Sequence, residues 1–311
     1  MSNDNKITTY SNNSYSLILE LIRKYGELKQ SDLVKLSGIS KSRVSEILTE
    51  LEKKGIIERK KLAGRNLIVR LSSRKFLTLG IIKAAEYPFI IPFIKLLKDR
   101  GYNVDVKVYN NGLEVTKDLS TGKLDMALSP VVTQLLFQKI FNNFKIIAGG
   151  AKGGGAILGE PSCNYIATTS LSSMEFWSLL YDPEASLIEF SSPEDMINAM
   201  RKKEIKKLSI WEPYVTILSN EGFRIIHTFE PLHCCTFAIR NGLDSEYFKE
   251  IYEQAFTSFL SHKDRWIQDY SSIVNIDYQV LKKSAENYVF DSYLDLNEIR
   301  RNMRKSGILL P

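Results

Sequence analysis

Apolar residues recur at helical spacing in three places near the start of the chain. One apolar stripe predicts a helix over residues 14–25, which ends before Gly26. A second, shorter helix is predicted within residues 29–38, and Ser40 is suited to cap a third helix over residues 41–54. Residues 56–72 then predict two short strands around a turn at Ala63-Gly64. Three helices followed by a hairpin is the element order of a winged helix.

The pattern changes near Phe76. Residues 76–84 form a continuous apolar run that is typical of a buried parallel strand, and a helix is predicted over 87–101. Strands predicted at 104–110 and 144–151 flank a helix at 131–141, and this alternation predicts an α/β fold with a mainly parallel sheet. The last seventy residues predict helices, among them 245–264 and 278–290.

Length and composition indicate two globular domains. A chain of 311 residues with 44% hydrophobic and 25% charged residues can bury sizeable cores. We expect a flexible N-terminus at residues 1–10, a winged-helix domain at 11–73 and an α/β domain at 74–311. No apolar run reaches the length of a membrane span, the first residues resemble no export signal, and three cysteines form no disulfide framework. These features predict a cytoplasmic protein.

The positive charge is concentrated at one end of the chain. Residues 11–73 hold 13 Lys and Arg and 7 Asp and Glu, so their net charge is +6. This equals the net charge of the whole chain. Such an asymmetry is typical of a module that binds a polyanion, attached to a neutral domain. A lysine-rich solvated surface is the alternative that charge alone leaves open.

Residues 37–60, SGISKSRVSEILTELEKKGIIERK, resemble the core of the MarR-like winged helix-turn-helix families. The resemblance implies that the third helix enters the major groove of double-stranded DNA and that the hairpin wing lies against the backbone or the minor groove. It places Lys41, Ser42, Arg43, Ser45 and Glu46 on the recognition helix, and Lys60, Lys61, Arg65 and Asn66 in the wing. An arginine can bind guanine through two hydrogen bonds, whereas lysines in a wing meet phosphates.

Two later segments resemble type II periplasmic solute-binding proteins. Leu119, Gly122 and Asp125 match a Leu-x-x-Gly-x-x-Asp pattern, and residues 210–226 resemble the Trp-Glu-Pro-Tyr segment of the nitrate, sulfonate and thiamine-pyrimidine-precursor branch. The resemblance implies a two-lobed α/β domain with a ligand in the cleft between the lobes. The residues expected to line that cleft are Glu86, Tyr87, Asn110, Asn111, Ser129, Gly149, Gly150, Lys152, Gly153, Gly154, Thr168, Thr169, Trp211, Glu212 and Tyr214.

Two kinds of effector fit these residues. Tyr87, Trp211 and Tyr214 can stack on a planar heterocycle while Glu86 or Glu212 accepts hydrogen bonds from its nitrogens. The glycine run 149–155 with Lys152 can instead close on a small anion, or it can serve as a hinge between the lobes. Core packing is the alternative for each aromatic side chain.

His233-Cys234-Cys235 is the one sequence that invites a metal or redox interpretation. Neighbouring side chains of a strand point to opposite faces, so His233 and Cys235 can share a face while Cys234 cannot. Two soft ligands fall short of a closed zinc pattern, which favours buried structural cysteines. We therefore expect no metal and no cofactor.

The predicted function is a homodimeric transcriptional regulator that senses a small molecule, a heterocycle or small anion, and binds double-stranded DNA. The main alternative is an enzyme of the thiamine-pyrimidine or menaquinone-synthesis type on the same binding-protein fold. No pair of nucleophile and base stands out in the sequence, so we expect no catalytic residues. A protein-binding adaptor is a third possibility.

Overall fold

The computed structural model describes residues 12–53, 56–61, 67–72 and 75–305. The chain divides into two compact units, Met1–Phe76 with Gly101–Asn103 and Leu77–Arg100 with Val104–Pro311. We call them unit 1 and unit 2 and describe each by itself. Residues 73 and 74, between which the sequence analysis places the domain boundary, lie outside the described residues.

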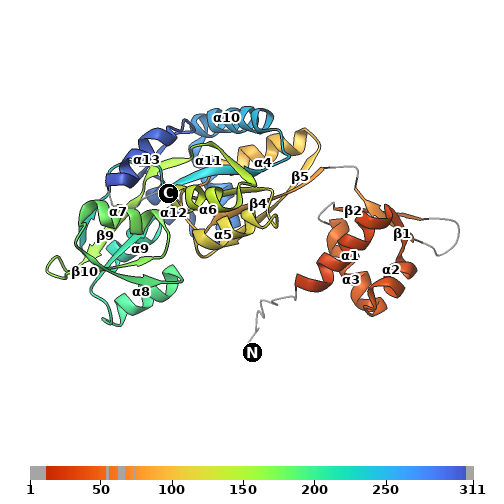
Figure 1. Ribbon diagram of the computed structural model, residues 1–311, viewed down its shortest axis with the longest axis horizontal. Helices are drawn as coiled ribbons and strands as arrows, with labels where there is room; N and C mark the ends of the chain where they lie inside the picture. Colours follow the sequence, from red (N-terminus) through yellow and green to blue (C-terminus); the bar gives the residue numbers. More distant parts are fainter. Residues whose placement is uncertain (1–11, 54–55, 62–66, 73–74, 306–311) are drawn as a thin grey trace. The chain divides into compact units, whose positions relative to one another are not determined.

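Unit 1 is a winged helix (Figure 1). Helices α1 (Asn12–Tyr25), α2 (Gln30–Ser37) and α3 (Lys41–Lys53) precede the antiparallel strands β2 (Ile57–Lys61) and β3 (Leu67–Leu71). The short strand β1 (Glu27–Lys29), which the periodicity did not predict, pairs with β3 and completes a sheet of order β1-β3-β2. The inward faces of all three helices meet in one core, which includes Ile18, Ile22, Leu33, Val44, Ile47, Leu48, Ile57 and Val69. The turn at Ala63-Gly64 lies outside the described residues.

Unit 2 contains two five-stranded sheets, which we call lobe I and lobe II. Lobe I has the order β5-β4-β6-β14-β7, and lobe II has the order β11-β10-β12-β9-β13. The strands of lobe I are β4 (Lys75–Ile82), β5 (Tyr102–Tyr109), β6 (Met126–Pro130), β7 (Phe144–Ala148) and β14 (Cys235–Arg240). Those of lobe II are β9 (Gly155–Gly159), β10 (Tyr165–Thr169), β11 (Ser186–Phe190), β12 (Lys207–Trp211) and β13 (Ile225–Thr228).

Helices cover both faces of the lobe I sheet (Figure 1). In the sheet, β5 lies on one side of β4 and β6 on the other, so the β4–β5 and β5–β6 connections run in opposite directions across the sheet. Right-handed crossovers therefore place α4 (Ile90–Asp99) and α5 (Gly112–Ser120) on opposite faces. Helix α6 (Val131–Phe141) packs with α5, while α10 (Ser245–Ser261) and α11 (Lys263–Val274) pack on α4. Aromatic side chains fill the α4 side, where the Phe237 and Tyr252 rings stack with centroids 4.4 Å apart.

In lobe II, α7 (Ser173–Tyr181), α8 (Pro193–Arg201) and α9 (Tyr214–Asn220) pack on the sheet. Strands β10, β11 and β12 are parallel, whereas β9 runs antiparallel to β12 and β13. The mixed α/β architecture with two lobes confirms the predicted fold class. No helix of the described residues is both long and apolar enough to cross a membrane.

The chain crosses between the lobes twice, and the two crossings lie together. The first crossing contains β8 (Ala151–Gly153), and the second runs from β13 to β14. Lys152 and His233 form an antiparallel bridge between the crossings, and Gly153 N donates to Leu232 O at 3.0 Å. On its other side β8 pairs with β15 (Tyr288–Phe290), which follows α12 (Tyr278–Ala285) and precedes α13 (Leu296–Lys305). Residues 278–290 were predicted as one helix, but their last three form this strand.

Candidate functional sites

Helix α3 presents the predicted recognition residues at the surface of unit 1. Lys41, Ser42 and Glu46 are exposed, and Arg43 and Ser45 are half-buried. Arg43 Nη1 lies 3.1 Å from Glu46 Oε2, and its guanidinium lies 5.7 Å from the centre of the Tyr15 ring. A carboxylate one turn away and an aromatic ring thus hold the Arg43 head group at the helix surface without burying it.

The wing strands are fastened by two ion pairs. Arg59 Nε donates to Glu52 Oε2 at 2.7 Å, which ties β2 to α3, and this hydrogen bond lowers the pKa of Glu52. Arg70 Nη2 lies 2.9 Å from Glu58 Oε2 across the β2–β3 pair. Lys60 is exposed on β2, and Lys61 is the last residue of that strand. Arg65 and Asn66 lie outside the described residues.

A small cavity of about 20 Å³ lies between the two lobes of unit 2. Lobe I and the second crossing contribute Ile82, Ala84, Glu86, Tyr87, Gly112, Pro130, Cys234 and Cys235 to its lining, and lobe II contributes Thr169, Ser172, Ser173, Met174 and Trp211. The structure therefore brings together four of the predicted ligand residues: Glu86, Tyr87, Thr169 and Trp211. Most of the lining side chains are apolar, and Glu86 carries the one carboxyl group among them.

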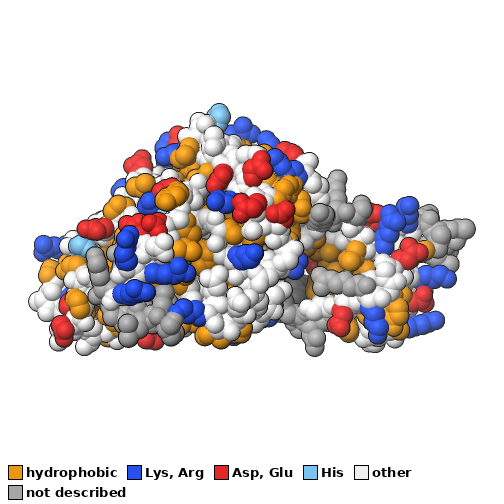
Figure 2. Space-filling view, turned by 45° about the horizontal axis from the view of Figure 1, so that its top comes forward, with side chains coloured by type: hydrophobic (Ala, Val, Ile, Leu, Met, Phe, Trp, Pro, Cys, Tyr) orange, Lys and Arg blue, Asp and Glu red, His pale blue; other side chains and the backbone are white. Residues whose placement is uncertain are grey.

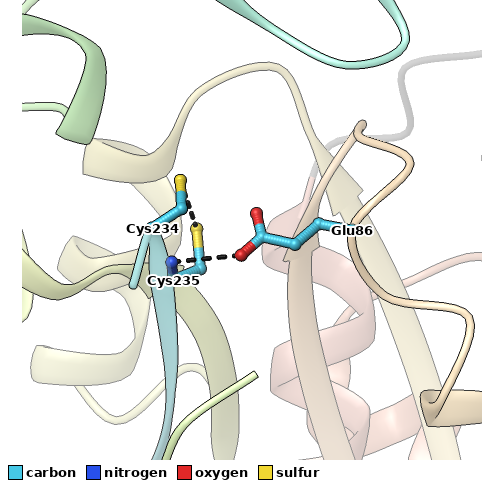
Figure 3. Close-up of side chains that lie close together, drawn as sticks. All are labelled: Glu86, Cys234 and Cys235. Carbon is cyan, nitrogen blue, oxygen red and sulfur yellow. Dashed lines mark hydrogen bonds between the residues drawn. The ribbon is translucent and has the colours of Figure 1, made fainter. Parts of the chain in front are cut away.

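Glu86, Cys234 and Cys235 (Figure 3), together with Tyr87, form the polar centre of this cavity. Cys235 N donates to Glu86 Oε1 at 3.1 Å, and Tyr87 OH donates to Cys235 Sγ at 2.9 Å. Glu86 is 1% exposed, and this burial raises the pKa of its carboxyl to about 7. Burial also raises the pKa of the Cys235 thiol well above its ordinary value.

Hydrogen bonds between the lobes close the cleft around this centre. Trp211 Nε1 donates to Lys83 O at 3.2 Å, and Ala85 N donates to Glu212 O at 3.0 Å. On the other side of the cavity, Ser173 Oγ donates to Cys234 O at 2.8 Å. Because these bonds join backbone and side-chain groups of both lobes, the described conformation is a closed one.

Glu212 and Tyr214 lie behind the cavity wall. Glu212 is fully buried and accepts from Thr216 N, Thr216 Oγ1 and Asn287 Nδ2, although burial still raises its pKa. Tyr214 packs edge-on against Trp211 and donates to Glu194 at 3.2 Å. Both residues therefore support the Trp211 wall and do not line the cavity.

The remaining predicted ligand residues also lie away from the cavity. Ser129 is buried inside lobe I, where it bonds to Thr116 and Gln134, and Thr168 is buried in β10 beside Thr169. Asn110 is exposed, and Asn111 caps α5 by accepting from Glu114 N at 2.9 Å.

The glycine run forms the first crossing. Gly149 O accepts from Tyr252 OH at 2.8 Å, and a Cβ on Gly150 would lie 3.2 Å from Cys235 O. Gly153 and Gly154 have φ angles of 80° and 71°, which glycine adopts without strain. Lys152 Nζ bonds to Asp291 Oδ2 at 2.6 Å and lines a separate pocket with His233 and Glu298. The run thus connects the lobes, as the hinge alternative expected, and its lysine is paired elsewhere.

The prediction for the two neighbouring cysteines was wrong in its geometry. Cys234 Sγ and Cys235 Sγ lie 3.7 Å apart and both line the cavity, while His233 faces the separate pocket beside Lys152. Strand β14 begins only at Cys235, so the alternation of a regular strand does not apply to Cys234. Cys234 N instead donates to Ala151 O of the first crossing, at 3.3 Å.

Sequence reasoning also missed the lobe II residues Ser172, Ser173 and Met174. Ser172 caps α7 by accepting from Glu175 N at 3.2 Å, so the start of this helix faces the cleft. The signal was present, because a Ser-Ser-Met-Glu sequence after a strand is a typical helix start.

The N-terminal region matches a family model and two curated relatives. Residues 12–64 match the model of the MarR family. An uncharacterised protein of Pyrococcus abyssi is 40% identical over 62 residues, which are 20% of this chain and 18% of that protein. One of Methanocaldococcus jannaschii is 39% identical over 62 residues, which are 20% of this chain and 13% of that protein. The chain thus matches less than a fifth of the length of these curated relatives.

Solved structures resemble the rest of the chain in fold. The ligand-binding component of an ABC-type import system from Staphylococcus aureus, with zinc bound, has a TM-score of 0.65 at 17% identity, over 76% of this chain and 94% of that chain. The alkanesulfonate-binding protein SsuA from Xanthomonas axonopodis pv. citri, bound to MOPS, has a TM-score of 0.63 at 14% identity, with the same coverage of both chains. The chain therefore joins a region that matches the MarR family to an α/β region with the fold of periplasmic binding proteins.

Proposed function

We propose that this protein is a transcriptional regulator whose winged helix binds double-stranded DNA and whose interlobe cleft binds a small-molecule effector. The observation that carries the proposal is the combination in one chain of an exposed Arg43-bearing recognition helix and a closed, polar-centred cleft. Effector binding in the cleft changes the affinity of the same chain for DNA, because a ligand that prefers one conformation shifts the population toward it.

The DNA contacts follow from the surface of unit 1. Arg43 reads a base edge after exchanging its contact with Glu46 for guanine, and Ser42 and Lys41 contact the adjacent backbone. Lys60 on the wing meets a phosphate. The protein binds as a homodimer, in which two recognition helices meet paired half-sites one turn of DNA apart.

The lining of the cleft favours a heterocyclic effector over a small anion. Among the described residues that line the cavity, Glu86 is the one carboxylic acid and none is Lys, Arg or His. Lys152, on which the anion alternative depended, is bonded to Asp291 outside the cavity. A buried carboxyl in a cavity that Tyr87 and Trp211 also line suits a planar ring that donates hydrogen bonds from its nitrogens.

The experiment is a fluorescence anisotropy titration of the full chain on its own upstream DNA and on random DNA at two salt concentrations. We expect tight binding to the upstream fragment, which a small-molecule cell extract changes for the wild type but not for Trp211→Ala. Arg43→Ala should lose the preference for the upstream fragment, whereas Arg201→Ala, which removes an exposed arginine of unit 2, should keep it. Equal binding of both DNAs by the wild type would contradict the regulator proposal.

A further inference from the structure

The three side chains Glu86, Cys234 and Cys235 form a compact set of potential metal ligands at the floor of the cleft. One carboxylate oxygen and the two sulfurs all lie within 4.8 Å of one another. Figure 3 shows the Glu86 carboxylate pointing from the loop after β4 toward the two thiols at the start of β14. The set therefore joins a loop of lobe I to the second crossing.

We propose that Glu86, Cys234 and Cys235 bind a thiophilic divalent metal ion, with Zn²⁺ as the fitting case, in a site that keeps one coordination position open to the cleft. Two sulfur ligands select zinc-like ions over magnesium and calcium, which prefer oxygen. The site is independent of DNA binding, and its test measures metal on the protein without DNA.

The spacing of the sulfurs suits tetrahedral coordination. Two sulfurs at about 2.3 Å from a tetrahedral zinc ion lie about 3.8 Å from each other. The observed separation of Cys234 Sγ and Cys235 Sγ is 3.7 Å, so the thiols need no rearrangement to share one ion. The carboxylate completes the third position by a side-chain movement of about an ångström, since zinc–oxygen bonds are about 2.0–2.2 Å long.

Groups around the three ligands supply a second layer of hydrogen bonds. Tyr87 OH donates to Cys235 Sγ at 2.9 Å and Cys235 N donates to Glu86 Oε1, and both donors stabilise the anionic, metal-binding forms. Binding proceeds as the metal ion displaces the two thiol protons to solvent and forms two metal–sulfur bonds, with no oxidant or reductant.

An open fourth position follows from the way the ligands are placed. All three ligands come from lobe I and the second crossing, whereas Ser172, Ser173 and Trp211 of lobe II line another part of the cavity. Three protein ligands with a fourth position left to water or a small molecule is the arrangement of reactive and ligand-binding zinc sites rather than of closed structural ones. A bound organic molecule with a nitrogen or oxygen donor can occupy that position.

The test is a titration of the reduced, chelator-treated full chain with Co²⁺, which reports thiolate ligands by a sulfur-to-metal charge-transfer absorption, followed by displacement with Zn²⁺. We expect one equivalent to bind to the wild type and to Cys163→Ser, which changes the third cysteine of the chain outside the cluster. Cys234→Ser and Cys235→Ser should lose the absorption band, and Glu86→Gln should bind at least tenfold more weakly.

Circular dichroism establishes that each variant is folded. If the cysteine variants do not fold, zinc X-ray absorption of the wild type decides, with two sulfur neighbours at about 2.3 Å supporting the site. The absence of the charge-transfer band in the wild type, its persistence in both cysteine variants, its loss in Cys163→Ser, or zinc neighbours that include no sulfur would each overturn the proposal.

Discussion

Asn111 Nδ2 donates a hydrogen bond of 2.9 Å to the carbonyl oxygen of Ser191, which joins the start of α5 in lobe I to the loop before α8 in lobe II. The same side chain caps α5 through its oxygen. One residue thus stabilises a helix and fastens the two lobes in the closed conformation, and sequence reasoning had assigned it to the ligand instead.

The two roles of Asn111 can be separated by Asn111→Asp. Aspartate keeps the cap oxygen but cannot donate to Ser191, so the closed conformation should lose about 1 kcal/mol, or about fivefold in population. Acrylamide quenching of tryptophan fluorescence measures the opening, since Trp211 lines the cleft. The increase in quenching should disappear when Trp211→Phe is added; an increase that survives this second change would contradict the prediction.

The buried Glu86 carboxyl makes the stability of the metal-free protein depend on pH. Its pKa rises from 4.5 to about 7 on folding, so it favours the folded state below about pH 4.5, and this contribution is lost as the pH rises through 7. The loss amounts to about 3 kcal/mol. Urea unfolding of chelator-treated protein at pH 5 and pH 8 should show a smaller decrease for Glu86→Gln than for the wild type. Parallel decreases in the two proteins would rule out this role of Glu86.

Gly154 tests the packing of the first crossing. A Cβ at this residue would lie 2.0 Å from the Tyr288 ring at a φ of 71°, so Gly154→Ala should destabilise unit 2 by about 3 kcal/mol. Gly222→Ala is the matched control, because φ is also positive there and no atom lies within 4 Å. It should cost about 1 kcal/mol. All three tryptophans lie in unit 2, so their fluorescence follows its unfolding; equal losses for both variants would refute the clash.

Lys60 gives a prediction for the wing. If it contacts a phosphate, Lys60→Ala weakens binding to all DNA sequences alike and reduces the slope of log K against log salt by about 1. Lys202→Ala is a control on the surface of unit 2, where basic and acidic side chains are interspersed (Figure 2). A salt slope that stays unchanged in Lys60→Ala would place the wing away from the DNA backbone.

Local patterns predicted most helices and strands, but not what the fold brings together. The helices of unit 1 follow from apolar periodicity, and β15 was missed because its three residues become a strand only by pairing with β8. Glu86 was found because it follows the first strand of the α/β domain, and Trp211 because residues 210–226 resemble a Trp-Glu-Pro-Tyr segment of solute-binding proteins. Cys234 and Lys152 were misjudged because their surroundings depend on how the two crossings pair, and no spacing in the sequence reports that pairing.

Because two of the three thiols are buried, the rate at which they react with an alkylating reagent reports how often the lobes separate. Cys234 and Cys235 are 6% and 1% exposed in the closed cleft, whereas Cys163 is only half-buried. An alkylating reagent added in excess therefore modifies Cys163 first. It reaches Cys234 and Cys235 only when the cleft between the lobes opens transiently. The lag between the first mass increment and the next measures how often the native molecule opens.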